Sequence, residues 1–275
     1  MKLIILFLLG STGLYFQQES SMMLLRNGIA RYHQGDFEGA IEQYNSAIEL
    51  EPQYWRYYMY RAKAKLELKD FVGAVQDYNT AFDIQPNFYE SLTKRGASRY
   101  SIHDFNIAVI DYQKANEFYP HRWIIHLMRG IAYTGFGDHE NALNDFSRAA
   151  ELQPDNYNIY LFRGVSRMNL GNLAEAREDF ERAQQLFPES EIPYLRSGVC
   201  CLEQGDTLGA LELCSKAIGI NPNYAEAYYV RGKLLLAFPE RLDGACADFK
   251  RADALGYREA YDMLNKYCDK ASLVE

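Results

Sequence analysis

The chain of 275 residues lacks the features that mark several protein classes. No internal stretch approaches the roughly 20 uninterrupted apolar residues of a membrane-spanning helix, which excludes a polytopic membrane protein. Glycine and proline are scarce, at 19 and 8 residues, which excludes a collagen-like or proline-rich fibre. Positive charge is outweighed, since 29 Lys and Arg stand against 37 Asp and Glu. The net charge of −8 argues against a general affinity for nucleic acid or anionic lipid.

Motifs that carry catalysis or hold a cofactor are missing as well. No CxxC, HxxxH or HExxH spacing supports a metal site. No phosphate-binding loop, Gly-x-Ser-x-Gly elbow or Rossmann glycine pattern occurs. We therefore expect no enzyme activity, no cofactor and no metal ion. An enzyme or small-ligand binder is the less favoured alternative, and it would need a closed pocket near residues 237–241.

Cysteines are few and are confined to the last third of the chain: Cys200, Cys201, Cys214, Cys246 and Cys268. An odd number leaves at least one cysteine unpaired unless two chains are linked. We expect free, buried cysteines that serve as small apolar residues. A disulfide between Cys201 and Cys214 is the alternative if the chain is exported.

The first 20 residues predict an export signal. Lys2 gives a positive start, residues 3–9 form a short apolar run, and Ser11-Thr12-Gly13 offers the small residues that signal peptidase selects. The run is short for a spanning helix. An uncleaved membrane anchor and a buried N-terminal helix of a cytoplasmic protein are the alternatives. Only an uncleaved segment would bring the chain to a membrane.

Six of the eight prolines fall on one lattice with a spacing of 34 residues: Pro52, Pro86, Pro120, Pro154, Pro188 and Pro222. This regularity reveals an internal repeat. With proline at position 32, the repeats begin at residues 21, 55, 89, 123, 157 and 191. An imperfect seventh repeat follows, with an extra residue near Pro239 and no terminal proline.

Other positions recur in the same register. Position 8 is small, positions 20 and 27 are alanine, and position 24 is aromatic except at Cys214. Positions 20, 24 and 27 lie on one face of a helix, where alanine permits close approach of a neighbour. Position 16 is Asp or Asn, which favours the start of a second helix. The proline ends that helix or opens the next one. Each repeat is therefore predicted to be two antiparallel helices.

This pattern resembles the tetratricopeptide repeat family over residues 21 to about 257. The resemblance implies an all-α, right-handed superhelical solenoid of seven antiparallel helix pairs. A stack of repeats leaves its last apolar face open, so we expect a C-terminal capping helix. The expected organisation is a signal or anchor at 1–20, seven repeats over 21–257, and the capping helix and tail at 258–275.

The resemblance also implies that the first helix of each repeat lines a concave groove, with positions 5 and 9 among those facing it. Repeats four to six carry no charge at these positions, which predicts an apolar surface for a protein or peptide partner: Leu127, Ile131, Leu161, Val165, Leu195 and Val199, flanked by Lys63 and Lys233. Packing against adjacent helices is the alternative for the same residues. The clamp that binds chaperone C-termini in some members is disfavoured, because Leu25 and Ile29 replace its Lys and Asn.

Two local features have both structural and functional interpretations. Residues 54–60 contain five aromatic side chains, for which packing is favoured over a binding hot spot. His126 occupies position 4, where other repeats have Leu or Tyr, and we expect it to be a hydrogen-bonded core or boundary residue.

Arginine at position 7 and aspartate at position 23 occur in the same five repeats: Arg61 with Asp77, Arg95 with Asp111, Arg129 with Asp145, Arg163 with Asp179, and Arg231 with Asp248. Repeats one and six have neither residue. Because the two residues are present or absent together, we expect a structural pair within each repeat.

Together these features predict a non-catalytic scaffold that holds a protein or peptide partner, outside the cytoplasm in a periplasmic or secreted setting. A cytoplasmic adaptor or chaperone-like holder is the alternative, and removal of the N-terminus in cells would distinguish the two.

Overall fold

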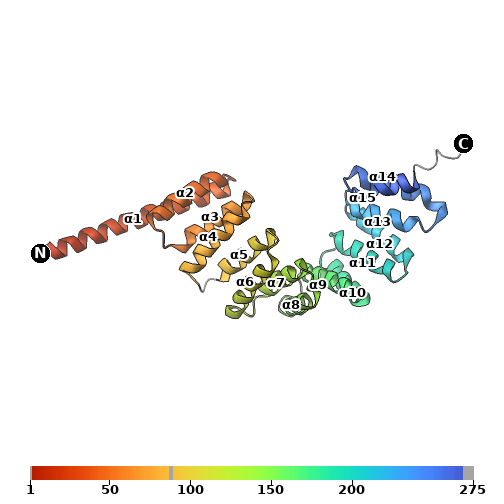
Figure 1. The fold of residues 1–275 in the computed structure, drawn as a ribbon, viewed down its shortest axis with the longest axis horizontal. Coiled ribbons are helices and arrows are strands. Elements are labelled where there is room, and N and C mark those ends of the chain that lie inside the picture. The colour runs from red at the N-terminus through yellow and green to blue at the C-terminus, as the bar shows by residue number, and fades with distance from the viewer. Residues whose placement is uncertain (1, 87–88, 269–275) are drawn as a thin grey trace. The chain divides into compact units, whose positions relative to one another are not determined.

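A computed structural model describes residues 2–86 and 89–268, with side chains from Gln18 onward. The chain divides into two compact parts, Met1–Asp138 and His139–Glu275 (Figure 1). All regular structure in the described residues is helical, and none of it is a strand. The all-α prediction is confirmed.

The N-terminal part contains the first three repeats and the first helix of the fourth. Its helices are α1 (Lys2–His33), α2 (Phe37–Leu50), α3 (Trp55–Glu67), α4 (Phe71–Ile84), α5 (Tyr89–Ser101), α6 (Phe105–Phe118) and α7 (Trp123–Gly135). Consecutive helices pack against one another from α1 through α7. Of the predicted leader, residues 1–20, the described residues 2–20 fall within the long helix α1. Its cleavage remains a prediction, and the side chains of residues 1–17 lie outside the described residues.

The C-terminal part completes the array. Its elements are α8 (His139–Leu152), α9 (Tyr157–Asn169), α10 (Leu173–Leu186), α11 (Ile192–Glu203), α12 (Thr207–Ile220), α13 (Ala225–Leu235), the 3-10 turn η1 (Pro239–Arg241), α14 (Leu242–Ala254) and α15 (Glu259–Tyr267). The extra residue of repeat seven is accommodated around η1. Within the described residues, no helix is long and apolar enough to cross a membrane.

The turn inside each of the first six repeats has a left-handed backbone at position 15. Glycine occupies it in four repeats, for example Gly35 with φ 80°, while Lys69 and His103 adopt φ 60° and 62° in the other two. Asp36, Asp70 and Asp206 then cap the second helix by accepting the N–H three residues later. Each of these three N–H groups belongs to a glycine, whose added Cβ would collide with the capping carboxylate. These three predicted caps are confirmed, whereas Asp104 and Asn172, with Ile107 and Glu175 at position 19, form no such hydrogen bond.

The core of each repeat follows the predicted register. Alanine at positions 20 and 27 is at most 1% exposed throughout, and the position-24 side chain is fully buried. A Cβ added to Gly96 would come within 2.9 Å of the Tyr112 ring, so the glycine at position 8 provides the space that the ring fills. Small residues and one large ring thus complement each other between paired helices.

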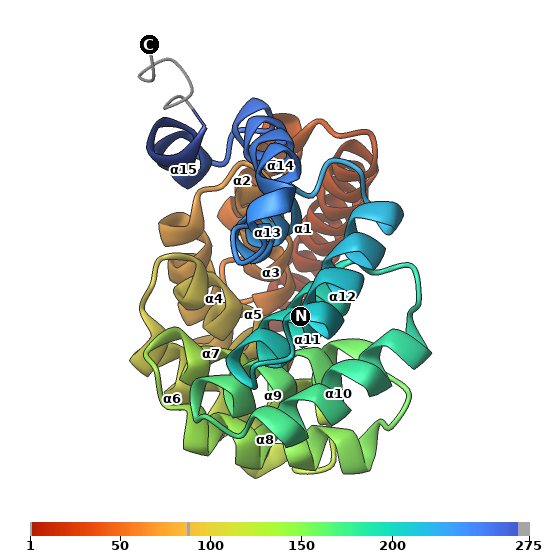
Figure 2. The same cartoon turned by 90° about the vertical axis from the view of Figure 1, so that its right-hand side faces the viewer.

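The last repeat is covered by α15, which packs against α14 and supports the predicted capping helix (Figure 2). Its predicted continuation past Cys268 lies outside the described residues. A disulfide joins Cys246 of α14 to Cys268, with 5.7 Å between their Cα atoms. The expectation of free cysteines is therefore wrong for these two residues, because the packing of α15 against α14 brings them together.

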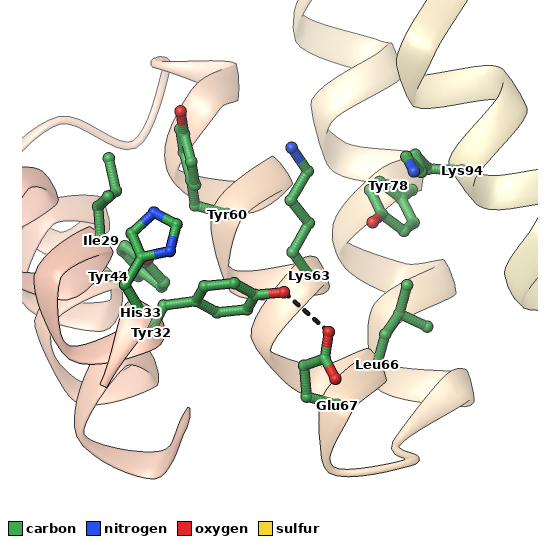
Figure 3. A pocket seen from close by; sticks show the side chains of 10 residues that line it. All are labelled: Ile29, Tyr32, His33, Tyr44, Tyr60, Lys63, Leu66, Glu67, Tyr78 and Lys94. Carbon is green, nitrogen blue, oxygen red and sulfur yellow. Dashed lines mark hydrogen bonds between the residues drawn. The ribbon is translucent and has the colours of Figure 1, made fainter. Parts of the chain in front are cut away.

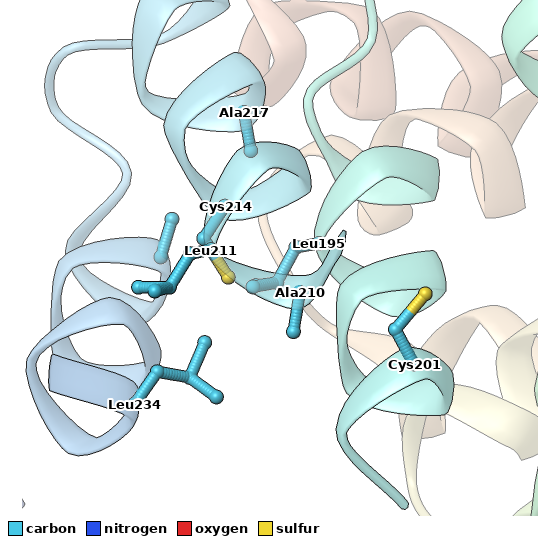
Figure 4. Close-up of a cluster of buried hydrophobic side chains, with 8 residues drawn as sticks. Leu195, Cys201, Ala210, Leu211, Cys214, Ala217 and Leu234 are labelled. Atoms are coloured by element: carbon cyan, nitrogen blue, oxygen red, sulfur yellow. The ribbon is translucent and has the colours of Figure 1, made fainter. Parts of the chain in front are cut away.

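The alternative pairing of Cys201 with Cys214 is wrong. Both are free and buried, as is Cys200, in agreement with their expected role as small apolar residues. Cys201 lies on α11 and Cys214 on α12. In Figure 4 the sulfur of Cys201 points away from Cys214.

Candidate functional site

An arginine–aspartate pair joins the two helices of four repeats. Arg61 Nη2 lies 2.6 Å from Asp77 Oδ1, and Arg61 Nε donates to Oδ2 over 2.9 Å. The same forked contact is formed by three further pairs: Arg95–Asp111, Arg163–Asp179 and Arg231–Asp248. All four lie within one repeat, as the covariation predicts. Arg129 and Asp145 belong to different parts of the chain, so their pairing remains a prediction.

A second cation reaches the same aspartate in three repeats. Lys65, Arg99 and Arg167 stand at position 11, one helical turn after the paired arginine. Arg99 Nη1 lies 2.6 Å from Asp111 Oδ2, and Asp111 is only 1% exposed. We call each such aspartate with its cations the ionic clasp. The second cation was not predicted, although basic residues recur at position 11 of several repeats.

The arginine also links successive repeats. Arg61 Nη1 donates to Asn45 Oδ1 of the preceding repeat over 2.6 Å, and Arg95 does the same to Asn79 over 2.8 Å. Arg231 contacts Ser215 at 3.2 Å. These contacts add an unpredicted joint between repeats, because position 25 faces the next first helix.

Position 4 supplies another joint between repeats. The hydroxyl of Tyr58 donates to the Pro52 carbonyl over 3.0 Å, and Tyr160 and Tyr228 repeat the contact. His126 Nε2 lies 3.1 Å from the Pro120 carbonyl, in the same role. His126 is therefore a buried, hydrogen-bonded boundary residue, as expected.

The six predicted groove residues fall into two sets. Leu127, Leu161 and Leu195 are buried, with at most 7% exposure. Ile131, Val165 and Val199 at position 9 remain partly exposed. The alternative of packing against adjacent helices therefore holds for position 5, since Leu161 belongs to the Phe180 cluster and Leu195 to the Cys214 cluster. Val165 packs against the Phe180 cluster as well, but part of its side chain stays exposed. Binding at position 9 stays a prediction.

The predicted polar flanks carry accessible ammonium groups. Lys63 lies 5.2 Å from the centre of the Tyr60 ring and 3.5 Å from Glu90. Lys233 is exposed and lies 5.5 Å from the centre of the Tyr229 ring. Lys63 belongs to the N-terminal part of the chain and Lys233 to the C-terminal part, so each flanks the first-helix surface of its own part.

A pocket of about 370 Å³ opens in the N-terminal part, on the first-helix face of repeats one to three (Figure 3). We call it the tyrosine pocket. It is lined by side chains from α1 to α5: Ile29, Tyr32, His33, Tyr44, Tyr60, Lys63, Leu66, Glu67, Tyr78 and Lys94. The binding surface predicted from the sequence lies in repeats four to six and does not include this pocket. Its signal was the change from tyrosine to phenylalanine at position 24 after repeat three.

Two hydroxyl groups of the tyrosine pocket have no hydrogen-bond partner among the described residues. They belong to Tyr44 and Tyr78, whose side chains are fully buried. Burial raises the pKa of both phenols above the ordinary value, so both keep their protons at neutral pH. Tyr32, by contrast, donates to Glu67 over 2.8 Å across the pocket.

A hollow of about 310 Å³ adjoins the tyrosine pocket and shares Tyr60 and Lys63 with it. Trp55, Arg56, Met59 and Glu90 complete its lining. The aromatic cluster at 54–60 thus has two roles: Tyr57 and Tyr58 are tied to residues 51 and 52 by hydrogen bonds, whereas Trp55 and Tyr60 line the surface hollows. Among the described residues, no three His, Cys, Asp or Glu side chains converge as metal ligands would.

The repeat register and the packing of the helix pairs agree with a family model. The tetratricopeptide repeat model matches residues 25–87 and 111–191, which is more than half of the chain. The chain belongs to the tetratricopeptide repeat family, whose members are generally non-catalytic scaffolds for protein interaction. A search of curated proteins finds no match.

Solved structures with similar folds include a tetratricopeptide repeat protein from Parabacteroides merdae. It is 21% identical, with a TM-score of 0.73 over 90% of this chain and 98% of that one. PilW, described as a type IV pilus biogenesis factor, is 19% identical, with a TM-score of 0.66 over 75% and 96%. YrrB, described as having an unusual peptide-binding site, is 21% identical, with a TM-score of 0.56 over 67% and 95%. At these identities the likeness shows the fold alone.

Proposed function

We propose that the chain is a non-catalytic scaffold that holds a protein or peptide partner on the face built by its first helices. The observation that carries the proposal is the row of position-9 side chains, which stay partly exposed while position 5 is buried in the core. Ile131 belongs to the N-terminal part of this row, and Val165 and Val199 to the C-terminal part. The peptide-binding site named for YrrB, a protein of the same fold, supports this use of the fold.

The surface at Val165 and Val199 is apolar, so its contact with a partner depends on burial of apolar area and only weakly on salt. Val165→Glu is a better test than a change at Leu161, because Leu161 is 7% exposed and a charge there would damage the core. Leu208→Glu is the matched control, since Leu208 is 67% exposed on the second helix α12.

The test is capture of crosslinked partners by the full chain in its native host. We expect Val165→Glu to reduce capture about tenfold, as loss of one buried apolar contact does, and Leu208→Glu to leave it unchanged. The opposite ranking, with circular dichroism showing both variants folded, would place the partner on the second helices and contradict the proposal.

We further propose that the scaffold works outside the cytoplasm, in a periplasmic or secreted setting. The N-terminal apolar segment and the Cys246–Cys268 disulfide support this setting, because structural disulfides persist in oxidising compartments. The remaining thiols suit it as well. Burial raises the pKa of Cys200 to about 11 and of Cys214 to about 12, which suppresses the reactive thiolate.

N-terminal sequencing and thiol alkylation of the protein from its host test this setting. We expect a start between residues 14 and 21, after the small residues Ser11-Thr12-Gly13, and an oxidised Cys246–Cys268 pair. A chain that begins at Met1, stays in the cytoplasmic fraction and has five alkylated cysteines would instead support the cytoplasmic adaptor or chaperone-like holder.

A further inference from the structure

Position 24 shows that the tyrosine hydroxyls are not needed for packing. The side chain is tyrosine in repeats one to three but phenylalanine at Phe146, Phe180 and Phe249, and all of these rings are fully buried. A buried hydroxyl without a partner destabilises the fold, because it has given up its hydrogen bonds to water. Tyr44, Tyr78 and Tyr112 therefore carry a cost that phenylalanine at the same position avoids. Of these three tyrosines, Tyr44 and Tyr78 line the pocket, which gives their hydroxyls a possible use that the hydroxyl of Tyr112 lacks.

The chemistry of the pocket identifies what an occupant must offer. Its two unpartnered hydroxyls are protonated and can donate, and Lys94 adds an ammonium donor, whereas the ammonium group of Lys63 already pairs with Glu90. Glu67 is the one acidic residue of the lining, and it already accepts from Tyr32. Lys94 forms no ion pair among the described residues. The available groups are thus mainly donors, in a chain whose overall charge is −8.

The shape of the pocket favours a slender occupant. Tyr44 and Tyr78 line the pocket but are fully buried, and their hydroxyls expose almost no surface, whereas Lys94 is exposed at the edge of the pocket. In Figure 3 the hydroxyl of Tyr78 points toward the side where Lys63 and Leu66 lie. A flexible acidic side chain brings a narrow acceptor between aromatic walls, whose ring edges are electropositive. The neighbouring hollow at Trp55 and Met59 offers room for the next residues of a chain that continues past the pocket.

We propose that the tyrosine pocket receives the carboxylate side chain of an internal Asp or Glu in an extended peptide partner, with Tyr44 and Tyr78 as hydrogen-bond donors and Lys94 as the counter-charge. This inference rests on the proposed peptide-binding function. It places the selective contact in repeats one to three and uses residues other than the apolar row of position 9.

Fluorescence anisotropy with the full chain tests the proposal. The probes are labelled peptides, capped at both ends, that carry Glu, Gln or Lys at one central position and an apolar residue beside it. We expect the Glu peptide to bind about tenfold or more tightly than the Gln peptide, as hydrogen bonds to a charged acceptor predict. The Lys peptide should bind weakest. A peptide with a free C-terminal carboxylate and no internal acid should bind no better than the Gln peptide.

Conservative variants assign the effect to the hydroxyls. The double variant Tyr44→Phe/Tyr78→Phe should lose most of the Glu preference, and Lys94→Met should reduce it. Tyr112→Phe is the matched control, because its hydroxyl is also buried without a partner but does not line the pocket. Thermal melts provide a second readout: none of the three Tyr→Phe changes should lower the melting temperature, since no hydrogen bond within the chain is lost.

The outcomes separate the two proposals. Equal binding of Glu and Gln peptides, tighter binding of the free C-terminal carboxylate, or an equal loss in Tyr112→Phe would overturn the pocket assignment. If partner capture still depends on Val165 in any of these cases, the proposed function stands without the pocket. If the Glu preference depends on Tyr44 and Tyr78 while Val165→Glu leaves partner capture unchanged, the pocket assignment is supported and the proposed binding surface at position 9 is wrong.

Discussion

Repeats three and six have the same helical architecture but different interiors. Repeat three contains an ionic clasp, in which Arg95 and Arg99 hold the buried carboxylate of Asp111. Repeat six has Ser197 and Leu213 at the paired positions, and Leu213 packs against an apolar cluster around Cys214. Both repeats keep the fully buried alanines at positions 20 and 27. The comparison shows that the helix pair depends on close alanine packing, whereas the clasp is an addition that fixes how the two helices are oriented.

Removal of the clasp carboxylate should have the largest effect. Asp111→Ala leaves two cations without their acceptor in a site where Asp111 is 1% exposed. We expect the free energy of unfolding to fall by about 3–5 kcal/mol, as when one partner of a buried ion pair is lost. Chemical denaturation measures the change, and Glu117→Ala, an exposed site on the same helix, should stay within about 0.5 kcal/mol.

The double variant Arg95→Ser/Asp111→Leu sharpens this comparison by giving repeat three the residues of repeat six. It should be more stable than Asp111→Ala alone, because Arg99, the remaining cation, is 16% exposed and can turn toward solvent. If the double variant were less stable than the single one, the clasp would be essential to the helix pair and not an addition.

Overpacking at the shared alanine should have an intermediate effect. Ala108→Leu adds three carbon atoms at a fully buried helix crossing, and Ala176 occupies the equivalent place in the C-terminal part. Each substitution should destabilise the fold by about 1–3 kcal/mol in a thermal melt. Unchanged melting temperatures in both variants would show that the close approach at position 20 is not required.

The smallest expected difference concerns the glycine at position 8. A Cβ at Gly96 would come 2.9 Å from the Tyr112 ring, whereas at Gly198 the nearest atoms, the Ala210 carbonyl oxygen and Cys214 Sγ, are 3.3 and 3.4 Å away. Gly198→Ala should therefore be neutral or gain up to about 1 kcal/mol of helix propensity, while Gly96→Ala should be less stable by about 1 kcal/mol. Equal effects in differential scanning calorimetry would show that Cys214 leaves no additional room.

The sequence was sufficient to predict features that depend on periodic spacing. The proline lattice, the alanine face and the Arg–Asp covariation predicted the helix pairs and the contact of Arg61 with Asp77, because each recurs many times in one register. Features that occur only once in the chain have no periodic signal and could not be predicted from spacing. The Cys246–Cys268 disulfide requires α15 to fold back on α14, and no repeat encodes that approach.

The candidate site was harder to predict than the fold, because residue spacing does not specify burial. Leu161 and Val165 are both apolar and lie one helical turn apart, yet Leu161 is in the core and Val165 is partly exposed. The tyrosine pocket is lined by side chains from five helices. The periodic pattern within one helix does not show which side chains of the other helices lie beside it.

The sharing of one guanidinium by two repeats has a consequence for cooperativity. Arg61 and Arg95 each hold the aspartate of their own repeat and the asparagine of the repeat before it, so neither repeat can open without breaking a charged contact of the other. At the joint of repeats five and six this charged contact is replaced by a neutral hydrogen bond of 3.0 Å between Gln184 and Ser197. Local opening should therefore pass less readily across that joint, which makes it a natural boundary between cooperative unfolding units of the C-terminal part.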